Sequence, residues 1–443
     1  MPDIDNLNDF NSDQKKAVTR RQFFGYTGAA IVGTTLSKPS FAGKPDLHIK
    51  PQTGMRYRRL GRTNLMISEV GVGCASMSLS RTLGPFLFEK WLRERGDVIN
   101  KLLDLGGNFV STTPYYHNTV ELLGKAVKGR RDEVYLAIGI YCGPEKKMRA
   151  DLEQVLKDLQ TDVIDLGFAY GNGDDDSFAV WRKFKQEGKV RFIGMSGHDP
   201  RKHEWAIRKG YVDWIHMPYN RLSRIKQGPG NLPGAERLFR LSKANDVGVI
   251  VIKPMTGNFI PNWAKETATP EIQEIMKKLK DYGPSNLYQA MLRWILQNPN
   301  VTACAVGMDT IQQVVEDCEA VRTRRLTAEQ KELLEMYAGI AGNDYCRMCE
   351  TCSQSCPRGV AIADILRFRM YYKNYGRRDY AINLYNELAD CQKVTQCDGC
   401  RLCERNCPNQ LAIVGKLQEA ASILGDDRAH SCQSFATRRS MTS

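Results

Sequence analysis

The sequence predicts an α/β protein in which a parallel (β/α)8 barrel is followed by a small helical domain. Between Met55 and Leu333, short apolar runs alternate eight times with longer segments of helical periodicity, which is the pattern of a closed parallel barrel. Beyond the barrel stand two cysteine runs of identical spacing, which are typical of a compact domain organised around metal. A chain of 443 residues is long enough for both parts.

Eight apolar runs are the expected barrel strands, and helix-period segments lie between them. The strands are expected at residues 69–72, 108–111, 134–138, 163–168, 192–195, 214–216, 248–252 and 303–306. The helices that follow them include residues 90–105, 120–127, 149–159, 178–186 and 287–297. A hairpin of residues 56–60 and 65–68 would close the barrel floor. A doubly wound open sheet is the alternative, but no G-x-G-x-x-G motif follows the first strand.

Both cysteine runs read C-x2-C-x2-C-x3-C-P and end at Pro357 and Pro408. In this arrangement three thiolates bind one 4Fe–4S cluster and the fourth binds the neighbouring cluster. The expected ligands are Cys346, Cys349, Cys352 and Cys407 for the first cluster, and Cys397, Cys400, Cys403 and Cys356 for the second. Zinc is the alternative metal, although a zinc site needs neither the third cysteine nor the proline. Residues from about 340 to 420 resemble a bacterial two-cluster ferredoxin module, which implies one-electron transfer.

Residues 1–42 look like a twin-arginine export signal. Arg20, Arg21 and Phe23 stand at the consensus positions, and a short apolar run leads to small residues that end at Ala42. The apolar run is too short to span a bilayer, so cleavage would leave a periplasmic protein. Because the twin-arginine pathway exports folded proteins, clusters could be built in the cytoplasm first. A cytosolic amphipathic helix is the alternative for this segment.

The expected organisation is a signal peptide at 1–42, a linker at 43–54, the barrel at 55–338, a ferredoxin-like domain at 339–425 and a tail at 426–443. The net charge is +13, but the basic residues are scattered and no nucleic-acid-binding motif is present. We therefore expect a small-molecule substrate or a redox partner protein, with no nucleic acid. A membrane-proximal or acidic partner suits the positive charge, and no further stretch is apolar enough to span a membrane.

Six of the 14 cysteines lie outside the two runs. Four of them stand in apolar segments and are expected to be buried: Cys74, Cys142, Cys304 and Cys318. Cys391 and Cys432 flank the second run and could pair or stay free.

Several motifs of the barrel resemble the aldo-keto reductases. They are YRRLGRT at 57–63, GNF at 107–109, ELLG at 121–124, RFIGMSGH at 191–198, PYN at 218–220 and KP at 253–254. The resemblance covers the whole barrel, and the subgroup with a C-terminal ferredoxin-like module matches the entire mature chain. It implies a barrel that moves a hydride from NADPH to a carbonyl, with a tyrosine that protonates the oxygen.

The family's catalytic tetrad is only partly present. Its pattern F-[IV]-D-T-[AS]-x-x-Y becomes FVSTTPYY at 109–116, so the tyrosine is Tyr116 and the aspartate is replaced by Ser111. The family's lysine position falls at Gly139, and its histidine position falls at Tyr170. A phenol has a pKa near 10, so without a nearby cation Tyr116 would be a slow proton donor.

The positions implied for nicotinamide binding also differ from the family. They are Ser196, His216, Tyr219, Lys253 and Gly307. Ser196-Gly197 replaces a serine–asparagine pair, and His216 replaces a glutamine. Asp309 stands where the family usually offers a cation to the 2′-phosphate, and its carboxylate would repel phosphate. These differences, together with export from the cytoplasm, weaken the expectation of NADPH as cofactor.

The candidate catalytic residues gather where the strands end, which is where barrel enzymes hold their active sites. They are Tyr116, His117, Tyr170 and His198. We expect an exported iron–sulfur oxidoreductase that passes electrons through two 4Fe–4S clusters to or from a substrate or partner at the barrel. The alternative is an NAD(P)H-dependent aldo-keto reductase that acts on a carbonyl substrate. A second alternative is a non-catalytic electron-transfer subunit.

Overall fold

The structure is a computed structural model that describes residues 48–78, 85–171, 173–222, 227–228, 232–256, 273–274, 277–278, 281, 284–341 and 345–425. The chain divides into two compact units, Met1–Gly43 and Lys44–Ser443. The expected signal peptide and the tail at 426–443 lie outside the described residues, and the linker is described only from residue 48. The barrel and the cysteine runs both belong to the second unit.

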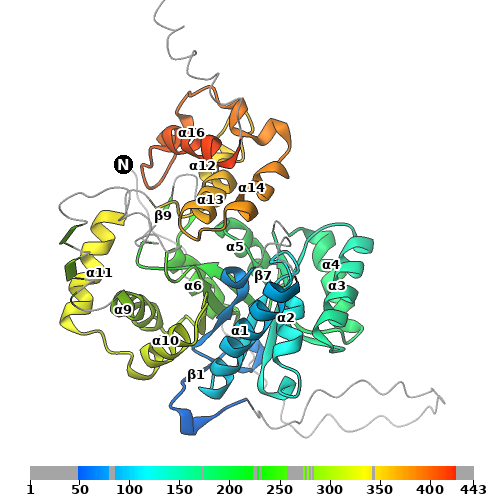
Figure 1. Ribbon diagram of the computed structural model, residues 1–443. Helices are drawn as coiled ribbons and strands as arrows, with labels where there is room; N and C mark the ends of the chain where they lie inside the picture. The colour runs from blue at the N-terminus through cyan, green and yellow to red at the C-terminus, as the bar shows by residue number, and fades with distance from the viewer. Residues whose placement is uncertain are drawn as a thin grey trace, which may run out of the picture. The chain divides into compact units, whose positions relative to one another are not determined.

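Eight parallel strands close into a barrel in the order β11-β12-β3-β4-β5-β6-β7-β8, with helices around it (Figure 1). The strands are β3 (Val70–Gly73), β4 (Phe109–Thr112), β5 (Tyr135–Tyr141), β6 (Ile164–Tyr170), β7 (Val190–Ser196), β8 (Trp214–Pro218), β11 (Gly248–Ile252) and β12 (Ala303–Val306). Every strand overlaps its predicted range, so the (β/α)8 prediction is confirmed and the open-sheet alternative is excluded. β5 and β6 run two or three residues further than predicted, as far as Tyr141 and Tyr170.

Helices α1 to α6 and α9 to α11 accompany the strands. They are α1 (Pro85–Asp104), α2 (Thr119–Ala126), α3 (Glu145–Leu159), α4 (Asp175–Gln186), α5 (Pro200–Arg208), α6 (Ala235–Ala244), α9 (Pro284–Leu296), α10 (Ile311–Thr323) and α11 (Ala328–Ala341). Two short strands, β9 (Gln227–Gly228) and β10 (Leu232–Pro233), pair before α6. α10 begins with a capping box, in which Thr310 and Gln313 each satisfy the other's backbone N–H.

Aromatic rings fill the barrel interior because glycines on neighbouring strands leave space for them. Gly139 on β5 pairs with Phe168 on β6, and a Cβ at Gly139 would lie 2.2 Å from the Phe168 ring. Gly194 pairs with Trp214 in the same way, with a distance of 2.4 Å. Both rings are almost fully buried. A side chain larger than hydrogen at either glycine would therefore displace a packed ring.

The predicted hairpin forms the barrel floor as β1 (Tyr57–Arg59) and β2 (Met66–Ser68). Next to it, the fully buried carboxylate of Glu69 accepts from Arg58 Nε at 2.6 Å and from Arg324 Nε at 2.9 Å. Arg58 also donates to the backbone carbonyl of Asn298 at 2.9 Å. This ion-pair network joins the hairpin to the loops that follow α9 and α10.

The cysteine-rich region folds into helices with a hydrophobic core of its own. These helices are α12 (Thr351–Gln354), α13 (Ile362–Lys373), α14 (Arg378–Asn386), α15 (Leu402–Arg405) and α16 (Ile413–Leu424). Their colours in Figure 1 run from yellow at α12 to red at α16. α12 and α15 occupy the same place in the two cysteine runs, and each follows a residue in the left-handed region, Glu350 and Arg401. The region is helical as predicted, and its likeness to a ferredoxin remains a prediction.

Polar contacts join the cysteine-rich helices to the barrel. Arg201 on α5 donates to the carbonyl of Cys349 at 3.2 Å, and Asn220 donates to the Tyr345 hydroxyl at 3.2 Å. The Arg367 side chain on α13 reaches His198 Nδ1 at 3.2 Å. These contacts come from the segments after β7 and β8, so the helical region meets the barrel at the carboxyl ends of its strands.

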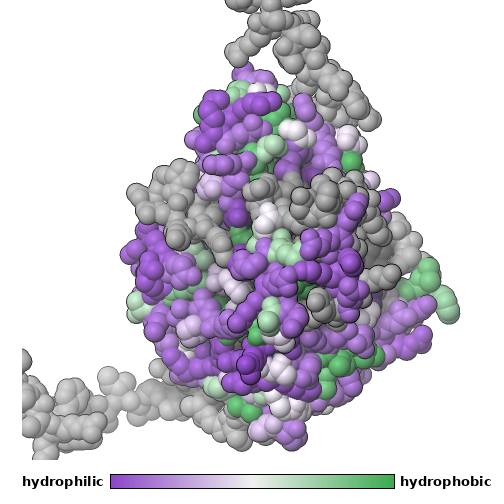
Figure 2. Space-filling model, turned by 90° about the vertical axis from the view of Figure 1, so that its left-hand side faces the viewer, coloured by the Kyte–Doolittle hydropathy of each residue, from purple (hydrophilic) through white to green (hydrophobic). Residues whose placement is uncertain are grey.

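On the face that Figure 2 shows, the coloured residues are mostly hydrophilic, and the hydrophobic ones form small separate groups. Among the described residues, no helix is both long enough and apolar enough to cross a membrane.

Candidate functional site

A cavity of about 370 Å³ opens at the carboxyl ends of the barrel strands. Its wall comes from the ends of β3, β4, β6, β7, β8, β11 and β12, and its roof includes Tyr371 and Tyr375 from α13 and the turn after it. The position is the one in which (β/α)8 enzymes hold their substrates. Tyr371 and Tyr375 lie between the two cysteine runs in the sequence. Their position in the roof was not predicted, because only the tertiary fold brings α13 over the barrel.

Seven of the nine predicted non-cysteine site residues line this cavity: Tyr116, Tyr170, Ser196, His198, His216, Lys253 and Gly307. The other two, His117 and Tyr219, lie elsewhere. His117 lies in the loop after β4, where its ring is nearly perpendicular to that of Tyr380, with the ring centres 5.8 Å apart. Tyr219 is buried between Phe239 and Trp294, where its ring stacks on Trp294 at 5.3 Å. Neither residue is among those that line the cavity.

Tyr116 and Tyr170 lie together, with their hydroxyl oxygens 3.4 Å apart. Burial, and to a lesser extent the negative charge that Tyr170 would carry, raises the pKa of Tyr116 well above 10. Burial likewise raises the pKa of Tyr170. Both phenols therefore stay protonated at neutral pH, and they serve better as hydrogen-bond donors than as proton donors.

The family's lysine cannot occupy its usual place because Phe168 fills the space. Phe168 lines the cavity opposite Gly139, and its ring would meet any side chain on that glycine. Ser111, which replaces the family's aspartate, also lines the cavity. The sequence showed that the two charged groups are missing, but it did not show which side chain takes their space.

Arg367 contacts His198 and thereby determines which ring nitrogen of His198 carries the hydrogen. A guanidinium can only donate, so His198 Nδ1 accepts and the neutral ring carries its hydrogen on Nε2. Burial, followed by the charges of Lys253 and Arg367, lowers the pKa of His198 well below 6.5. His198 Nε2 is buried without a hydrogen-bond partner among the described residues. His216 Nε2 is likewise buried without a hydrogen-bond partner among the described residues. Burial lowers the pKa of His216 to about 3.

Lys253 follows β11 with a backbone φ of 54°, which is the left-handed region that a lysine seldom adopts. Asn220 donates to its carbonyl at 3.1 Å and helps to hold this conformation. The ammonium lies 5.3 Å from the centre of the Tyr371 ring. Burial lowers the pKa of Lys253. The strained backbone therefore places a lysine at the junction of the cavity wall and its roof.

Three acidic residues line the other side of the cavity, on α10 and the loop before it: Asp309, Glu316 and Asp317. Of these, only Asp309 was noticed in the sequence. Burial raises the pKa of Asp317 from 3.8 to about 8, so its carboxyl is largely protonated at neutral pH. Asp317 was not predicted, because the helical periodicity of residues 311–323 does not show that a carboxyl group is buried there.

Asp317→Asn is expected to flatten the pH dependence of stability. Because the pKa of Asp317 is raised in the folded state, its contribution is fully present below about pH 4 and is lost as the pH rises through about 8. The free energy of unfolding of the variant, relative to that of the native protein, should rise by at least about 1 kcal/mol between about pH 5 and about pH 8. Thermal unfolding at both pH values measures it, with Glu316→Gln as the control on the same helix. Parallel pH profiles for the native protein and Asp317→Asn would contradict the buried position of Asp317.

The structure divides the eight motif cysteines into two groups. Cys346, Cys349, Cys352 and Cys407 surround one small cavity, and Cys356, Cys397, Cys400 and Cys403 surround another. This is the same partition that the spacing predicted. Among the described residues, no group of three or more His, Cys, Asp or Glu side chains is arranged to hold a single metal ion. The donor set around each cavity is nevertheless that of a 4Fe–4S cluster, which is larger than one ion and is bound by four thiolates.

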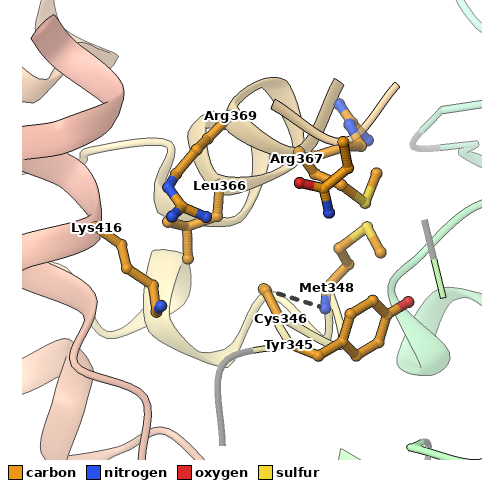
Figure 3. Close-up of a pocket in the computed structure, with 9 residues that line it drawn as sticks. Tyr345, Cys346, Met348, Leu366, Arg367, Arg369 and Lys416 are labelled. Atoms are coloured by element: carbon orange, nitrogen blue, oxygen red, sulfur yellow. Dashed lines mark hydrogen bonds between the residues drawn. The ribbon is translucent and has the colours of Figure 1, made fainter. Parts of the chain in front are cut away.

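Basic side chains line the cleft beside Cys346. Figure 3 shows Arg367 and Arg369 from α13 and Lys416 from α16 around this cleft, together with Tyr345 and Met348. The Met348 backbone N–H donates to Cys346 Sγ at 3.4 Å. An N–H donor and nearby cations are the groups that stabilise negative charge on cysteine sulfur.

The remaining described cysteines follow the sequence prediction in part. Cys74, Cys304 and Cys318 are buried, whereas Cys142 is only partly buried. Cys391 is exposed and free, and its proposed partner Cys432 lies outside the described residues.

The profile of the Aldo/keto reductase family matches residues 90–337. The chain therefore belongs to this family, and it is an oxidoreductase. L-galactose dehydrogenase of Arabidopsis thaliana is 28% identical over 319 residues, which cover 65% of this chain and 94% of the relative. The oxidoreductase YqkF of Bacillus subtilis is 24% identical over 64% of this chain and 96% of its own length. The structure of aldo-keto reductase AKR11C1 from Bacillus halodurans in its holo form has a TM-score of 0.50, with 26% identity over 63% of this chain and 95% of that one. The family match ends before the first cysteine run.

Proposed function

We propose that the protein transfers a hydride between NAD(P)H and the carbonyl or alcohol carbon of a small substrate in the barrel cavity. The comparisons favour this alternative over the cluster-mediated transfer expected from the sequence, because the family and the named relatives are reductases and dehydrogenases. The observation that carries the proposal is the cavity at the strand ends, which contains His216 with a buried ring nitrogen that has no partner among the described residues. Such a group suits the carboxamide of a nicotinamide.

The nicotinamide supplies the hydride when it is bound. Ser196 and His216 offer polar atoms to its amide, and Tyr371 and Tyr375 shield the cavity from water. Tyr116 stays protonated, so it donates a hydrogen bond to the substrate oxygen and leaves the final proton to a more acidic group or to water. We expect slow turnover, because a glycine, Gly139, stands where the family has the lysine that would assist Tyr116.

A fluorescence titration of the full-length, anaerobically purified protein with NADPH and with NADH tests the proposal. We expect saturable binding of at least one nucleotide with a Kd below about 1 mM. Oxidation of the bound nucleotide should then require a carbonyl compound. Absence of binding at concentrations well above that value would contradict the proposal.

A second candidate function is favoured by the two cavities, each lined by four cysteines. In this function, two 4Fe–4S clusters exchange electrons with a substrate or with a redox partner protein. The cysteines would bind the clusters, and Lys416 would offset negative charge beside Cys346. Clusters relay single electrons, so they would serve this function in place of nicotinamide or beside it.

Cys400→Ala is expected to remove one cluster of the two. Iron and acid-labile sulfide should fall from about eight of each per chain to about four, and one electron paramagnetic resonance signal of the reduced protein should disappear. Cys391→Ala is the matched control, because Cys391 is also exposed but lies outside the cavity. A native protein without iron, or a Cys400→Ala variant with the full iron content, would rule out the assigned ligands.

Export by the twin-arginine pathway and a membrane-proximal redox partner remain proposals from the sequence. The residues that carry the export prediction lie outside those that the structure describes.

A further inference from the structure

One corner of the barrel cavity presents hydrogen-bond donors without a charged acceptor. Lys253 lines this corner. The groups that act on its ammonium most strongly are the Tyr371 side chain, which hydrogen-bonds to it, and the Arg367 guanidinium, with no carboxylate among them. None of the ion pairs between described residues includes Lys253, whereas Arg367 is neutralised by Asp364 at 2.6 Å. A cation shielded from water without a counter-anion is costly, so such a site favours an anionic ligand.

His198 adds a second donor to the same corner. Because Arg367 occupies its Nδ1, the neutral ring carries its proton on Nε2, where no acceptor is found among the described residues. The low pKa of His198 means that the ring does not add a second positive charge there. An ammonium without a counter-anion and an N–H without an acceptor suit an oxyanion, which accepts at several lone pairs.

The acidic side of the cavity does not neutralise Lys253. Asp309, Glu316 and Asp317 belong to α10 and the loop before it. The first two have polar partners of their own: Arg95 on α1 lies 3.9 Å from Asp309, and Gln312, which is also on α10, donates to Glu316 at 2.8 Å. Burial raises the pKa of Asp309 and that of Asp317. The cavity thus has one donor-rich corner and one side lined by carboxyl groups.

We propose that Lys253 and His198 form a binding site for an oxyanion of the substrate, so that the protein acts on a small carboxylate- or phosphate-bearing compound. The assignment of this oxyanion to the substrate depends on the proposed function, whereas oxyanion binding itself does not. Tyr371 covers the ammonium from the roof, so α13 completes the site. Neutral sugars and simple ketones would leave the charge of Lys253 unpaired and would bind weakly.

Isothermal titration of the full-length protein with pyruvate, methyl pyruvate and inorganic phosphate tests the proposal. Methyl pyruvate keeps the keto group of pyruvate but carries an uncharged methyl ester in place of the carboxylate. We expect pyruvate or phosphate to bind at least about 10-fold more tightly than methyl pyruvate. Lys253→Met should reduce the ratio of these affinities to about 1. Lys253→Arg should keep most of the difference, because the positive charge remains.

Two further variants test whether the preference for charged ligands comes from the proposed oxyanion site. Lys90→Met removes a surface cation that lies 3.8 Å from Glu94, so it should leave every affinity unchanged. His198→Leu should weaken oxyanion binding without abolishing it, which keeps the proposal testable if Lys253→Met does not fold.

A native protein that does not distinguish charged from neutral ligands, or a folded Lys253→Met that keeps the preference, would overturn the site. Binding of phosphate alone, lost in Lys253→Met, would identify the oxyanion as phosphate. Because the titration needs neither NAD(P)H nor turnover, failure of hydride transfer would leave its outcome unaffected.

Discussion

Gly139→Lys is expected to destabilise the protein strongly, although it restores the charged residue that the family carries at this position. A Cβ at Gly139 would lie 2.2 Å from the buried ring of Phe168, which faces it from β6. Overpacking in a tight core costs about 1–3 kcal/mol, and an ammonium forced among aromatic rings adds to that cost. We expect a loss of at least about 3 kcal/mol in the free energy of unfolding, measured by thermal unfolding.

Gly143→Lys is the matched control, because Gly143 lies a few positions further along the chain and a Cβ at this glycine would have no described atom within 4 Å. Its effect should stay within about 0.5 kcal/mol. The double variant Gly139→Lys with Phe168→Ala should recover part of the lost stability, since it removes the ring that blocks the lysine. If Gly139→Lys alone were as stable as the native protein, Phe168 would not fill the place of the family's lysine.

Glu69→Gln is expected to cost about 3–5 kcal/mol, because it leaves Arg58 and Arg324 without their shared carboxylate. Glu69 is fully buried and joins the floor hairpin to the loops after α9 and α10. Thermal unfolding followed by circular dichroism measures the loss. Tyrosine fluorescence from the cavity should change in the same transition, because the floor and the cavity belong to one barrel.

Glu319→Gln provides the comparison for this buried network. Glu319 is exposed and pairs with Arg322 at 3.4 Å, so its loss should change stability by less than about 1 kcal/mol. Equal effects of the two substitutions would show that the Glu69 network contributes no more than a surface ion pair.

The fold could be predicted from the sequence because its signals are local and repeated. All eight barrel strands are short apolar runs, and β11 and β12 begin and end where periodicity placed them. The ends of β5 and β6 were missed because each strand ends in a tyrosine, Tyr141 or Tyr170, where the apolar pattern stops. The pairing of Gly139 with Phe168 depends on strand register, which the sequence does not specify.

The site was predicted less completely than the fold. Tyr116, His198 and Lys253 follow strands, so their place at the cavity could be anticipated. Tyr371 and Tyr375 lie more than 100 residues further along the chain, and only the tertiary packing of α13 brings them there. Tyr219 also follows a strand, yet its ring turns into the core against Trp294. Position after a strand therefore locates a residue at the rim but does not fix the direction of its side chain.

Hydride transfer in the cavity can be tested most directly with NADPH or NADH that carries deuterium at the reactive carbon of the nicotinamide. The full-length, anaerobically purified protein would be mixed with the labelled nucleotide and a set of carbonyl compounds that includes pyruvate. We expect one deuterium per product molecule, at the carbon that bore the carbonyl group. A reduced product without deuterium, formed at the same rate when the nucleotide is left out and a one-electron donor is supplied, would contradict hydride transfer and favour the cysteine-bound clusters as the source of electrons.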